Sequence, residues 1–476
     1  MNESTPSGWF TAPLLLLVIF IAATLGPVLL GFDHFPKKSV DHDHHHIPVV
    51  LSFAERLPEV DLSDYASATT PGMHLAMAVF LSATGFSDPR ATETLLQVCS
   101  CFFGVLLVLA AFRYASRISS PWTAFVCVLP VASSPYVLGN AIWVMTDNLS
   151  LALIAVTVGT TLFCEANGAF AFRSGVALVC SVFVRQINIW VSGVAMVGYL
   201  LQWTPVRRHL TFPDQPQTLG NGFVPMVIFA VATILAAGVI IGFVLLWGGL
   251  VPPMFQIGGG GMTHAGGFNY GVTPGVLSLL GVYASPAIVI LMPFWIRDGR
   301  IVRTMMIGLG IGLLAGLTFE SVAGKEYGRI SGWLWLFASK APAVLGRSCL
   351  VFAGSIVGGG TAGVLFGLLT TAGRGRTACL LAGFAISFST AYTVNSWAFQ
   401  RYFDPTILLA IGWCLASLET STRVRGAPES APSGLGRADC KPLGLVQVRL
   451  AAIGVFAMQA VFAAFTLYGK MGWSAD

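Results

Sequence analysis

Long apolar runs recur along this 476-residue chain and decide what it can fold into. A helix rises 1.5 Å per residue and bilayer hydrocarbon is about 30 Å thick, so a span needs about 20 apolar residues. Runs of roughly this length occupy thirteen ranges: 12–32, 92–112, 121–141, 148–164, 169–185, 187–203, 223–247, 274–296, 304–320, 349–371, 377–394, 404–420 and 450–469. We therefore predict an all-α polytopic membrane protein with about thirteen transmembrane helices.

The composition excludes a soluble globular protein. Hydrophobic residues make up 55% of the chain and charged residues only 10%, with a mean hydropathy of +0.76, whereas soluble domains carry roughly a quarter charged residues. We expect residues 1–476 to form a single integral membrane domain that contacts membrane lipids and no nucleic acid. The first run, from Pro13 to Phe32, is long enough to stay as an anchor instead of being cleaved as a signal.

The distribution of Lys and Arg predicts the orientation of the spans, because cytoplasmic loops are enriched in these residues. The apolar run at 71–86 would reach only about 24 Å as a helix, so we interpret it as an interfacial helix. Most of the 26 basic residues then fall in cytoplasmic loops. This orientation predicts a first outer loop at 33–91, with interfacial helices and the catalytic acid, and a flexible cytoplasmic loop at 421–448, rich in Gly, Pro and Ser.

The first outer loop holds the densest polar motif, Asp41-His42-Asp43-His44-His45-His46. Carboxylates and imidazoles are costly in hydrocarbon, so we expect this motif to lie in water at a membrane surface. Other polar motifs fall at span ends on the same side: Thr146-Asp147-Asn148, Arg185-Gln186-Ile187-Asn188, Lys325-Glu326-Tyr327-Gly328-Arg329 and Gln400-Arg401-Tyr402-Phe403-Asp404-Pro405. A carboxylate here could deprotonate an acceptor hydroxyl, and Arg or Lys could hold the phosphate of a lipid carrier. The motifs therefore predict chemistry on the non-cytoplasmic face.

The order of these motifs resembles the α-1,2-glucosyltransferase family, C-type (GT-C) glycosyltransferases that add the terminal glucose to lipid-linked oligosaccharide from dolichyl-phosphate-glucose. The resemblance covers most of the chain and rests on Asp43-His44-His45-His46-Ile47-Pro48, Thr69-Thr70-Pro71-Gly72, Thr146-Asp147, Arg185-Gln186-Ile187-Asn188-Ile189, Arg329 followed by Trp333 and Trp335, and Arg401-Tyr402-Phe403. It implies inverting transfer of a hexose, expected to be glucose, from a polyprenyl- or dolichyl-phosphate sugar to a glycan or lipid-linked acceptor. The implied location is the endoplasmic reticulum membrane or a bacterial plasma membrane.

Roles for individual residues follow from this chemistry and this resemblance. Asp43 is the predicted general base, and Asp41 is the second candidate. The predicted donor-phosphate-binding residues are Arg329, Arg401 and Lys325. The predicted substrate-binding residues are His46, Asp147, Arg185, Gln186 and Tyr402.

Simpler interpretations stay open for several of these residues. Asp147 could cap the helix that begins at Asn148, and Arg185 and Lys325 could be interface anchors whose charges reach toward water. The histidine motif could bind a divalent ion such as Zn or Mn. We instead expect a reaction that needs no metal or other cofactor, because a cation-bound carboxylate is a poor base. A transporter or flippase of a lipid-linked sugar is the alternative function, although no internal repeat of the kind common in transporters is evident.

Overall fold

The computed structural model describes residues 7–31, 41–85, 88–210, 212–214, 222–256, 267–324, 327–329, 332–424 and 444–472, and most of them are helical. In chain order the helical elements are α1 (Ser7–Leu29), η2 (Asp41–His46), α2 (Ile47–Arg56), α3 (Gly72–Thr84), α4 (Pro89–Ile118), α5 (Pro121–Ala132), α6 (Pro135–Ile142), α7 (Asp147–Phe163), α8 (Gly168–Val184), η3 (Gln186–Trp190), α9 (Val191–Leu200), α10 (Thr204–His209), α11 (Phe223–Trp247), α12 (Pro253–Gln256), α13 (Val272–Ile290), α14 (Met292–Trp295), α15 (Gly299–Thr318), α16 (Trp333–Lys340), α17 (Cys349–Thr371), α18 (Gly375–Thr393), α19 (Gln400–Val424) and α20 (Leu445–Gly472). The sheet found in the described residues is a small antiparallel hairpin of β1 (Ala343–Val344) and β2 (Arg347–Ser348).

Within the described ranges, seven helices are long and apolar enough to cross a membrane, namely α1, α4, α11, α13, α15, α17 and α20. The pair α5 and α6 would add an eighth span, bent by 70° at the break between its helices. The chain is an all-α polytopic membrane protein, as the sequence predicts. Each of the thirteen apolar runs falls on a helix or on two adjoining helices. The number of crossings stays a prediction, because α7, α8 and η3 with α9 are shorter apolar segments.

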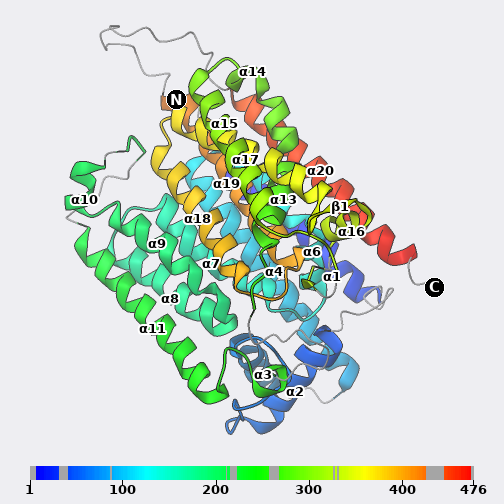
Figure 1. Cartoon of the computed structure of the whole chain (residues 1–476). Helices are drawn as coiled ribbons and strands as arrows, with labels where there is room; N and C mark the ends of the chain where they lie inside the picture. Colours follow the sequence, from blue (N-terminus) through cyan, green and yellow to red (C-terminus); the bar gives the residue numbers. More distant parts are fainter. Residues whose placement is uncertain are drawn as a thin grey trace.

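Residues 41–85 form a cap at one end of the helix bundle, whereas α10 and α14 lie toward the opposite end (Figure 1). The cap has its own apolar core, in which Phe53 of α2 and Met77 of α3 pack together with Trp247 of α11. Arg207 and Arg208 lie in α10, so these basic residues are separated from the cap as the charge distribution predicts. Which end faces the cytoplasm stays a prediction. Residues 33–40 and 86–87 of the first loop, and 425–443 of the predicted flexible loop, lie outside the described residues.

Asp404 fixes the start of α19, the helix that carries Arg401. The side chain of Asp404 is fully buried. Ser134 Oγ donates to the Asp404 carboxylate at 2.9 Å, Tyr283 OH also donates to it, and Gln459 Nε2 lies 3.4 Å away. These donors come from the break before α6, from α13 and from α20. Since a buried carboxylate needs its hydrogen bonds, this network sets the position of α19 relative to three other elements.

Glycines let α17 lie directly against the backbones of α13 and α15. A Cβ atom on Gly358 would meet the carbonyl oxygen of Leu277 in α13, and one on Gly359 would meet the carbonyl oxygen of Gly308 in α15. Small residues allow membrane helices to approach this closely. The three helices therefore interlock through backbone atoms, and the glycine run at 358–360 serves packing.

We expect Gly359→Ala to lower the thermal unfolding midpoint of the purified protein in detergent. The new Cβ would collide with a backbone carbonyl that cannot swing aside, and overpacking of this kind costs ~1–3 kcal/mol. Gly310→Ala, in the neighbouring helix α15, is the matched control, since nothing lies within 4 Å of where its Cβ would be. The control should keep or slightly raise the midpoint. Equal midpoints for the two variants would contradict the backbone contact.

Candidate active site

The histidine motif folds as a turn of π-helix, η2, that runs directly into α2. Pro48 stands in the first turn of α2, where its missing N–H breaks no helical hydrogen bond. His42 and His46 are buried, while Asp41 and Asp43 are half-buried. The turn therefore buries two imidazoles and leaves both carboxylates partly accessible.

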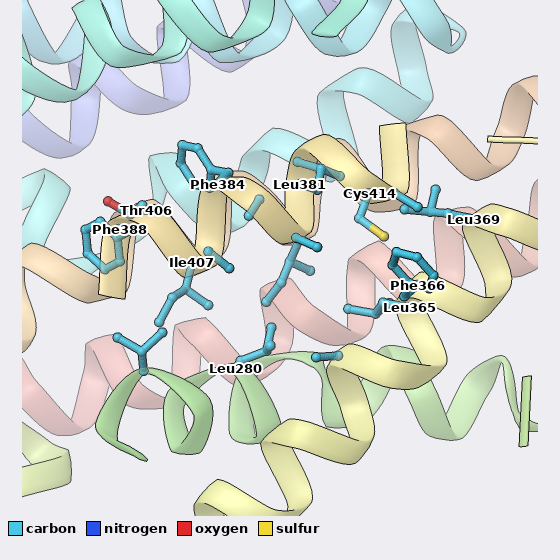
Figure 2. A pocket seen from close by; sticks show the side chains of 17 residues that line it. Leu280, Leu365, Phe366, Leu369, Leu381, Phe384, Phe388, Thr406, Ile407 and Cys414 are labelled. Atoms are coloured by element: carbon cyan, nitrogen blue, oxygen red, sulfur yellow. The ribbon is translucent and has the colours of Figure 1, made fainter. Parts of the chain in front are cut away.

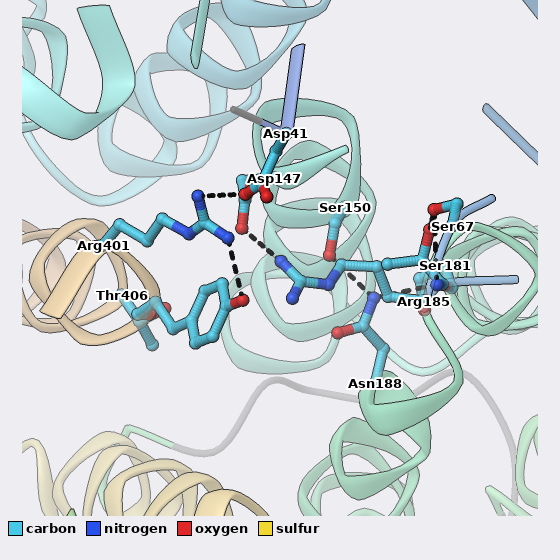
Figure 3. Close-up of polar contacts among 11 residues, drawn as sticks. Asp41, Ser67, Asp147, Ser150, Ser181, Arg185, Asn188, Arg401 and Thr406 are labelled. Atoms are coloured by element: carbon cyan, nitrogen blue, oxygen red, sulfur yellow. Dashed lines mark hydrogen bonds and ion pairs between the residues drawn. The ribbon is translucent and has the colours of Figure 1, made fainter. Parts of the chain in front are cut away.

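Asp41 forms an ion pair with Arg401 at the start of α19 (Figure 3). Asp41 Oδ2 lies 2.6 Å from Arg401 Nη1. Burial raises the pKa of Asp41, but the charge and the hydrogen bond of Arg401 outweigh burial and hold that pKa below its usual value. Asp41 is therefore an ionised carboxylate that reaches from the cap to a helix of the bundle.

A second ion pair lies beside the first. Asp147, the first residue of α7, pairs with Arg185, which directly follows α8. The Tyr402 ring contacts both guanidiniums: its centroid is 4.5 Å from Arg185 Cζ and 5.1 Å from Arg401 Cζ. Arg401 Nη2 donates to the Tyr402 hydroxyl at 3.1 Å. The carboxylates and the aromatic ring together make two neighbouring cations tolerable in a buried place.

Four of these groups, namely Asp147, Arg185, Arg401 and Tyr402, line a small polar pocket. Its polar lining consists of Asn140, Asp147, Asn148, Ser150, Arg185, Tyr392, Arg401, Tyr402 and Thr406. The pocket measures about 20 Å³, which is room for about one water molecule. Side chains must therefore shift before a larger group can enter.

An apolar cavity of about 130 Å³ adjoins this pocket (Figure 2). It lies among α13, α17, α18 and α19, with Leu280, Leu365 and Phe384 in its wall. Phe388 and Thr406 line both the cavity and the polar pocket. The cavity follows α19 from Thr406 to Cys414, a length of about 12 Å at 1.5 Å per residue. A cationic pocket and an apolar cavity therefore share a common wall.

His46, a predicted substrate-binding residue, faces the interior of the cap. Its Nδ1 lies 2.9 Å from Nε2 of His74 in α3, and both imidazoles are buried. Burial lowers the pKa of His46 to about 3, although the charge of Asp41 opposes this shift, and burial also holds the pKa of His74 well below its usual value. Both rings are therefore neutral near pH 7, and their contact joins η2 to α3.

Asp43, the predicted general base, lies in a different group from Asp41. Its Oδ1 is 4.0 Å from Nε2 of His42, whose ring also lies 3.3 Å from Oε1 of Glu93 in α4. These three residues could offer metal-ligand atoms within 4.8 Å of one another. The backbone N–H of Val144 donates to Nδ1 of His42 at 2.9 Å, so the ring proton of a neutral His42 resides on Nε2. Nε2 then donates a hydrogen bond and has no lone pair for a metal ion.

Gln186, also predicted to bind substrate, holds the backbone of the cap. Its Nε2 donates to the carbonyl oxygens of Ala68 and Leu250, each at 3.0 Å, and its Oε1 accepts from the N–H of Thr70 at 3.2 Å. Its amide is thus occupied by backbone groups. The contact brings the Thr69-Thr70-Pro71-Gly72 motif beside the motif that begins at Arg185.

Arg329, predicted to hold the donor phosphate, occupies a separate buried cluster. Its Nε donates to Asn269 at 2.8 Å and its Nη1 to the Val322 carbonyl at 3.0 Å, and its guanidinium lies over the Tyr327 ring. Burial lowers the pKa of Arg329 to about 10, so it remains a cation at pH 7. It does not line the polar pocket among the described residues. Lys325, the third predicted phosphate ligand, lies outside the described residues.

The site also contains residues that the motifs did not single out, namely Asn140, Tyr392, His74 and Glu93. Two of them left a signal in the sequence. Asn140 is an amide inside an apolar run and His74 is an imidazole inside another, and polar groups in such runs are costly unless they have a role.

No family model matches this sequence, and no curated protein matches it. Among solved structures, the oligosaccharyltransferase AglB from Archaeoglobus fulgidus, in complex with an inhibitory peptide and a dolichol-phosphate, is 12% identical, with a TM-score of 0.47 over 98% of this chain and 55% of that chain. ArnT from Cupriavidus metallidurans, bound to undecaprenyl phosphate, is 15% identical, with a TM-score of 0.35 over 98% of this chain and 78% of that chain. This chain thus spans about half the length of AglB. At TM-scores below 0.5 these likenesses carry no argument about its chemistry, which rests on its own residues.

We expect the protein to lose stability as the pH falls from about 6.5 toward 3. Unfolded histidine binds a proton below about pH 6.5, whereas folded His46 stays neutral until about pH 3. Acid therefore favours the unfolded state, by up to about 1.4 kcal/mol per pH unit for each such histidine. Thermal midpoints measured in detergent between pH 7 and pH 5 check this slope.

His46→Gln should flatten that slope, because it removes one of the buried imidazoles. The matched control is His44→Gln in the same turn, since His44 is exposed and its replacement should leave the slope unchanged. A slope that stays at the wild-type value in His46→Gln would show that the buried pair is not its source.

Proposed function

We propose that this protein is a glycosyltransferase that takes a sugar from a polyprenyl- or dolichyl-phosphate carrier. The observation that carries the proposal is the wall shared by the two cavities: Phe388 and Thr406 line both the pocket of Arg185 and Arg401 and the apolar cavity. A lipid phosphate has the matching layout, an anion at the end of a long apolar chain.

The two guanidiniums suit a departing phosphate. Arg185 and Arg401 stay charged at any working pH, and a guanidinium can bind phosphate oxygens through two parallel hydrogen bonds. The isoprenoid chain would enter the cavity among α13, α17, α18 and α19, where the lining is almost entirely apolar. When the isoprenoid chain binds, it would exchange apolar contacts with membrane lipid for apolar contacts with the protein. The phosphate would therefore supply most of the selectivity for the carrier over other lipids.

Asp41 is the general base in this proposal, in preference to Asp43. A base must lie within hydrogen-bond reach of the hydroxyl that it deprotonates, and Asp41 is the acid of the cap that contacts Arg401. Asp43 instead lies beside His42 and Glu93. A phosphate near Arg401 would share its positive charge, so donor binding would loosen its hold on Asp41 and raise the pKa of that carboxyl.

The reaction needs a single displacement. The acceptor oxygen forms a bond to C1 of the sugar while the bond from C1 to the phosphate oxygen breaks. The acceptor proton passes to the Asp41 carboxylate, and the electron pair of the broken bond leaves with the lipid phosphate, whose charge Arg185 and Arg401 stabilise. Without an enzyme nucleophile, the configuration at C1 inverts.

The finer specificity rests on the sequence motifs. We propose a hexose donor, glucose in the first instance, and a glycan or lipid-linked acceptor, as the resemblance to the α-1,2-glucosyltransferases implies. The reaction would take place on the non-cytoplasmic face of an endoplasmic reticulum or bacterial plasma membrane, which the distribution of basic residues supports.

Reconstitution of the purified protein with dolichyl-phosphate-glucose and candidate acceptors tests the proposal. Formation of a glycosidic bond with release of lipid phosphate is the expected result. Movement of the lipid-linked sugar across the bilayer without bond formation would instead favour a flippase, which the same cavities could serve.

In that assay we expect Asp41→Asn to lose about a hundredfold or more of the transfer rate, since loss of a general base typically costs this much. Asp43→Asn is the matched control two residues away, and it should keep most of the activity. The reverse outcome, an inactive Asp43→Asn and an active Asp41→Asn, would return the role of base to Asp43.

We also expect full activity in the presence of EDTA. One reason is the tautomer of His42, whose protonated Nε2 faces Asp43 and Glu93 and so cannot bind a metal ion. The other is that the guanidiniums can stabilise the leaving phosphate without a metal ion. Turnover that is abolished by chelation and restored by Mn or Mg would assign Asp43 and Glu93 to a metal site.

A further inference from the structure

Two buried side-chain nitrogens of the polar pocket have no hydrogen-bond partner among the described residues. They are Nδ2 of Asn140 and Nε of Arg401, and both residues line the pocket. Asn140 is only 5% exposed. Among the described residues that line this pocket, no other side chain carries an unpartnered buried nitrogen or oxygen.

Other side-chain nitrogens in the same pocket do have hydrogen-bond or ion-pair partners in the protein. Asn148 lines the same pocket and donates from Nδ2 to the Val137 carbonyl at 2.9 Å. The other two nitrogens of Arg401 are also engaged, Nη1 by Asp41 and Nη2 by Tyr402. These contacts fix the guanidinium and leave its Nε unpaired. Because a buried donor without a partner is costly, two of them in one pocket point to a ligand that brings the acceptor.

The place of Asn140 depends on the break between α5 and α6. Ser134 caps α6 by accepting the N–H of Tyr136 at 3.3 Å, and Pro135 cannot continue α5. The two helices consequently meet at 70°. The bend places Asn140, part of an apolar run, in the lining of a pocket that holds two cations.

We propose that Asn140 and Arg401 together bind a phosphate oxygen of the lipid carrier, through Nδ2 and Nε. This inference rests on the proposed function and adds Asn140 to the residues that hold the donor. The unpartnered groups are donors only, which suits a phosphate oxygen better than a sugar hydroxyl, since a hydroxyl also has a proton to give. Nε is a different nitrogen of Arg401 from the Nη1 that pairs with Asp41. A phosphate bound there would compete with Asp41 for the charge of one guanidinium, as the proposed function requires.

Binding of undecaprenyl phosphate to the purified protein in detergent, measured by isothermal titration calorimetry, tests the proposal. We expect Asn140→Leu to raise the Kd by about tenfold or more, the usual effect of losing a hydrogen bond to a charged group. Its thermal midpoint should equal or exceed that of the wild type, because an unpaired buried donor is gone. Asn140→Asp keeps the side-chain size but turns the donor into an anion, and should raise the Kd further.

Asn148→Leu is the matched structural control. It lines the same pocket, but its amide holds the Val137 carbonyl, so its replacement should lower the thermal midpoint. Asn140→Leu with an unchanged Kd, or with a midpoint lowered like that of Asn148→Leu, would overturn the inference.

Two further outcomes separate the sources of failure. If the wild type does not bind undecaprenyl phosphate, the proposed function itself fails. If Asn140→Leu binds undecaprenyl phosphate normally but binds the sugar-loaded carrier weakly, Asn140 contacts the sugar and the phosphate assignment is wrong.

Discussion

The site depends on the neutralisation of two guanidiniums, one buried and one half-buried, by carboxylates from distant parts of the chain. Arg185 and Arg401 meet Asp147 and Asp41 around the ring of Tyr402. An uncompensated charge in such a place is strongly destabilising, whereas a paired one is tolerated. The pairing therefore ties η2, α7, the end of α8 and the start of α19 to one another, and a displacement of any of them would leave a charge exposed to apolar surroundings.

The cap takes part in this balance and does more than cover the bundle. It contributes Asp41, which pairs with Arg401 of the pocket, and it is held to the end of α8 by the contacts of Gln186 with the backbone of Ala68 and Thr70. The contact of His46 with His74 joins η2 to α3 within the cap. The charge of the pocket thus depends on whether the cap is docked, so the structure of the first loop and the electrostatics of the site cannot be altered independently.

The elements of the bundle could be predicted from the sequence because a span requires an apolar run of nearly fixed length, and each predicted run falls on a helix or on two adjoining helices. The side chains of the site were only partly predictable. Arg401, Arg185, Asp147 and Tyr402 come together as the motifs imply. Which of Asp41 and Asp43 contacts Arg401 could not be predicted from the sequence, because it depends on a tertiary contact between the cap and α19. Arg329 carries the expected charge, but Asn269 and a carbonyl hold it elsewhere, and no local pattern encodes that competition. Asn140 lines the pocket because of the bend between α5 and α6. Pro135 marks that break in the sequence, but the contact of Ser134 with Asp404, which joins the break to α19, is tertiary.

The interlocked glycines of α17 bear on how a lipid could enter. Gly358 and Gly359 bring the backbone of α17 into direct contact with the backbones of α13 and α15 at Leu277 and Gly308. A movement of α17 relative to these helices would break all of these contacts at once. Another side of the apolar cavity is closed by side chains of α18, among them Phe384 and Phe388, which also pack against Trp190. If an isoprenoid chain occupies the cavity as proposed, the backbones of α13, α15 and α17 would stay in place while it enters, and the side chains that line the cavity from α18 would have to shift.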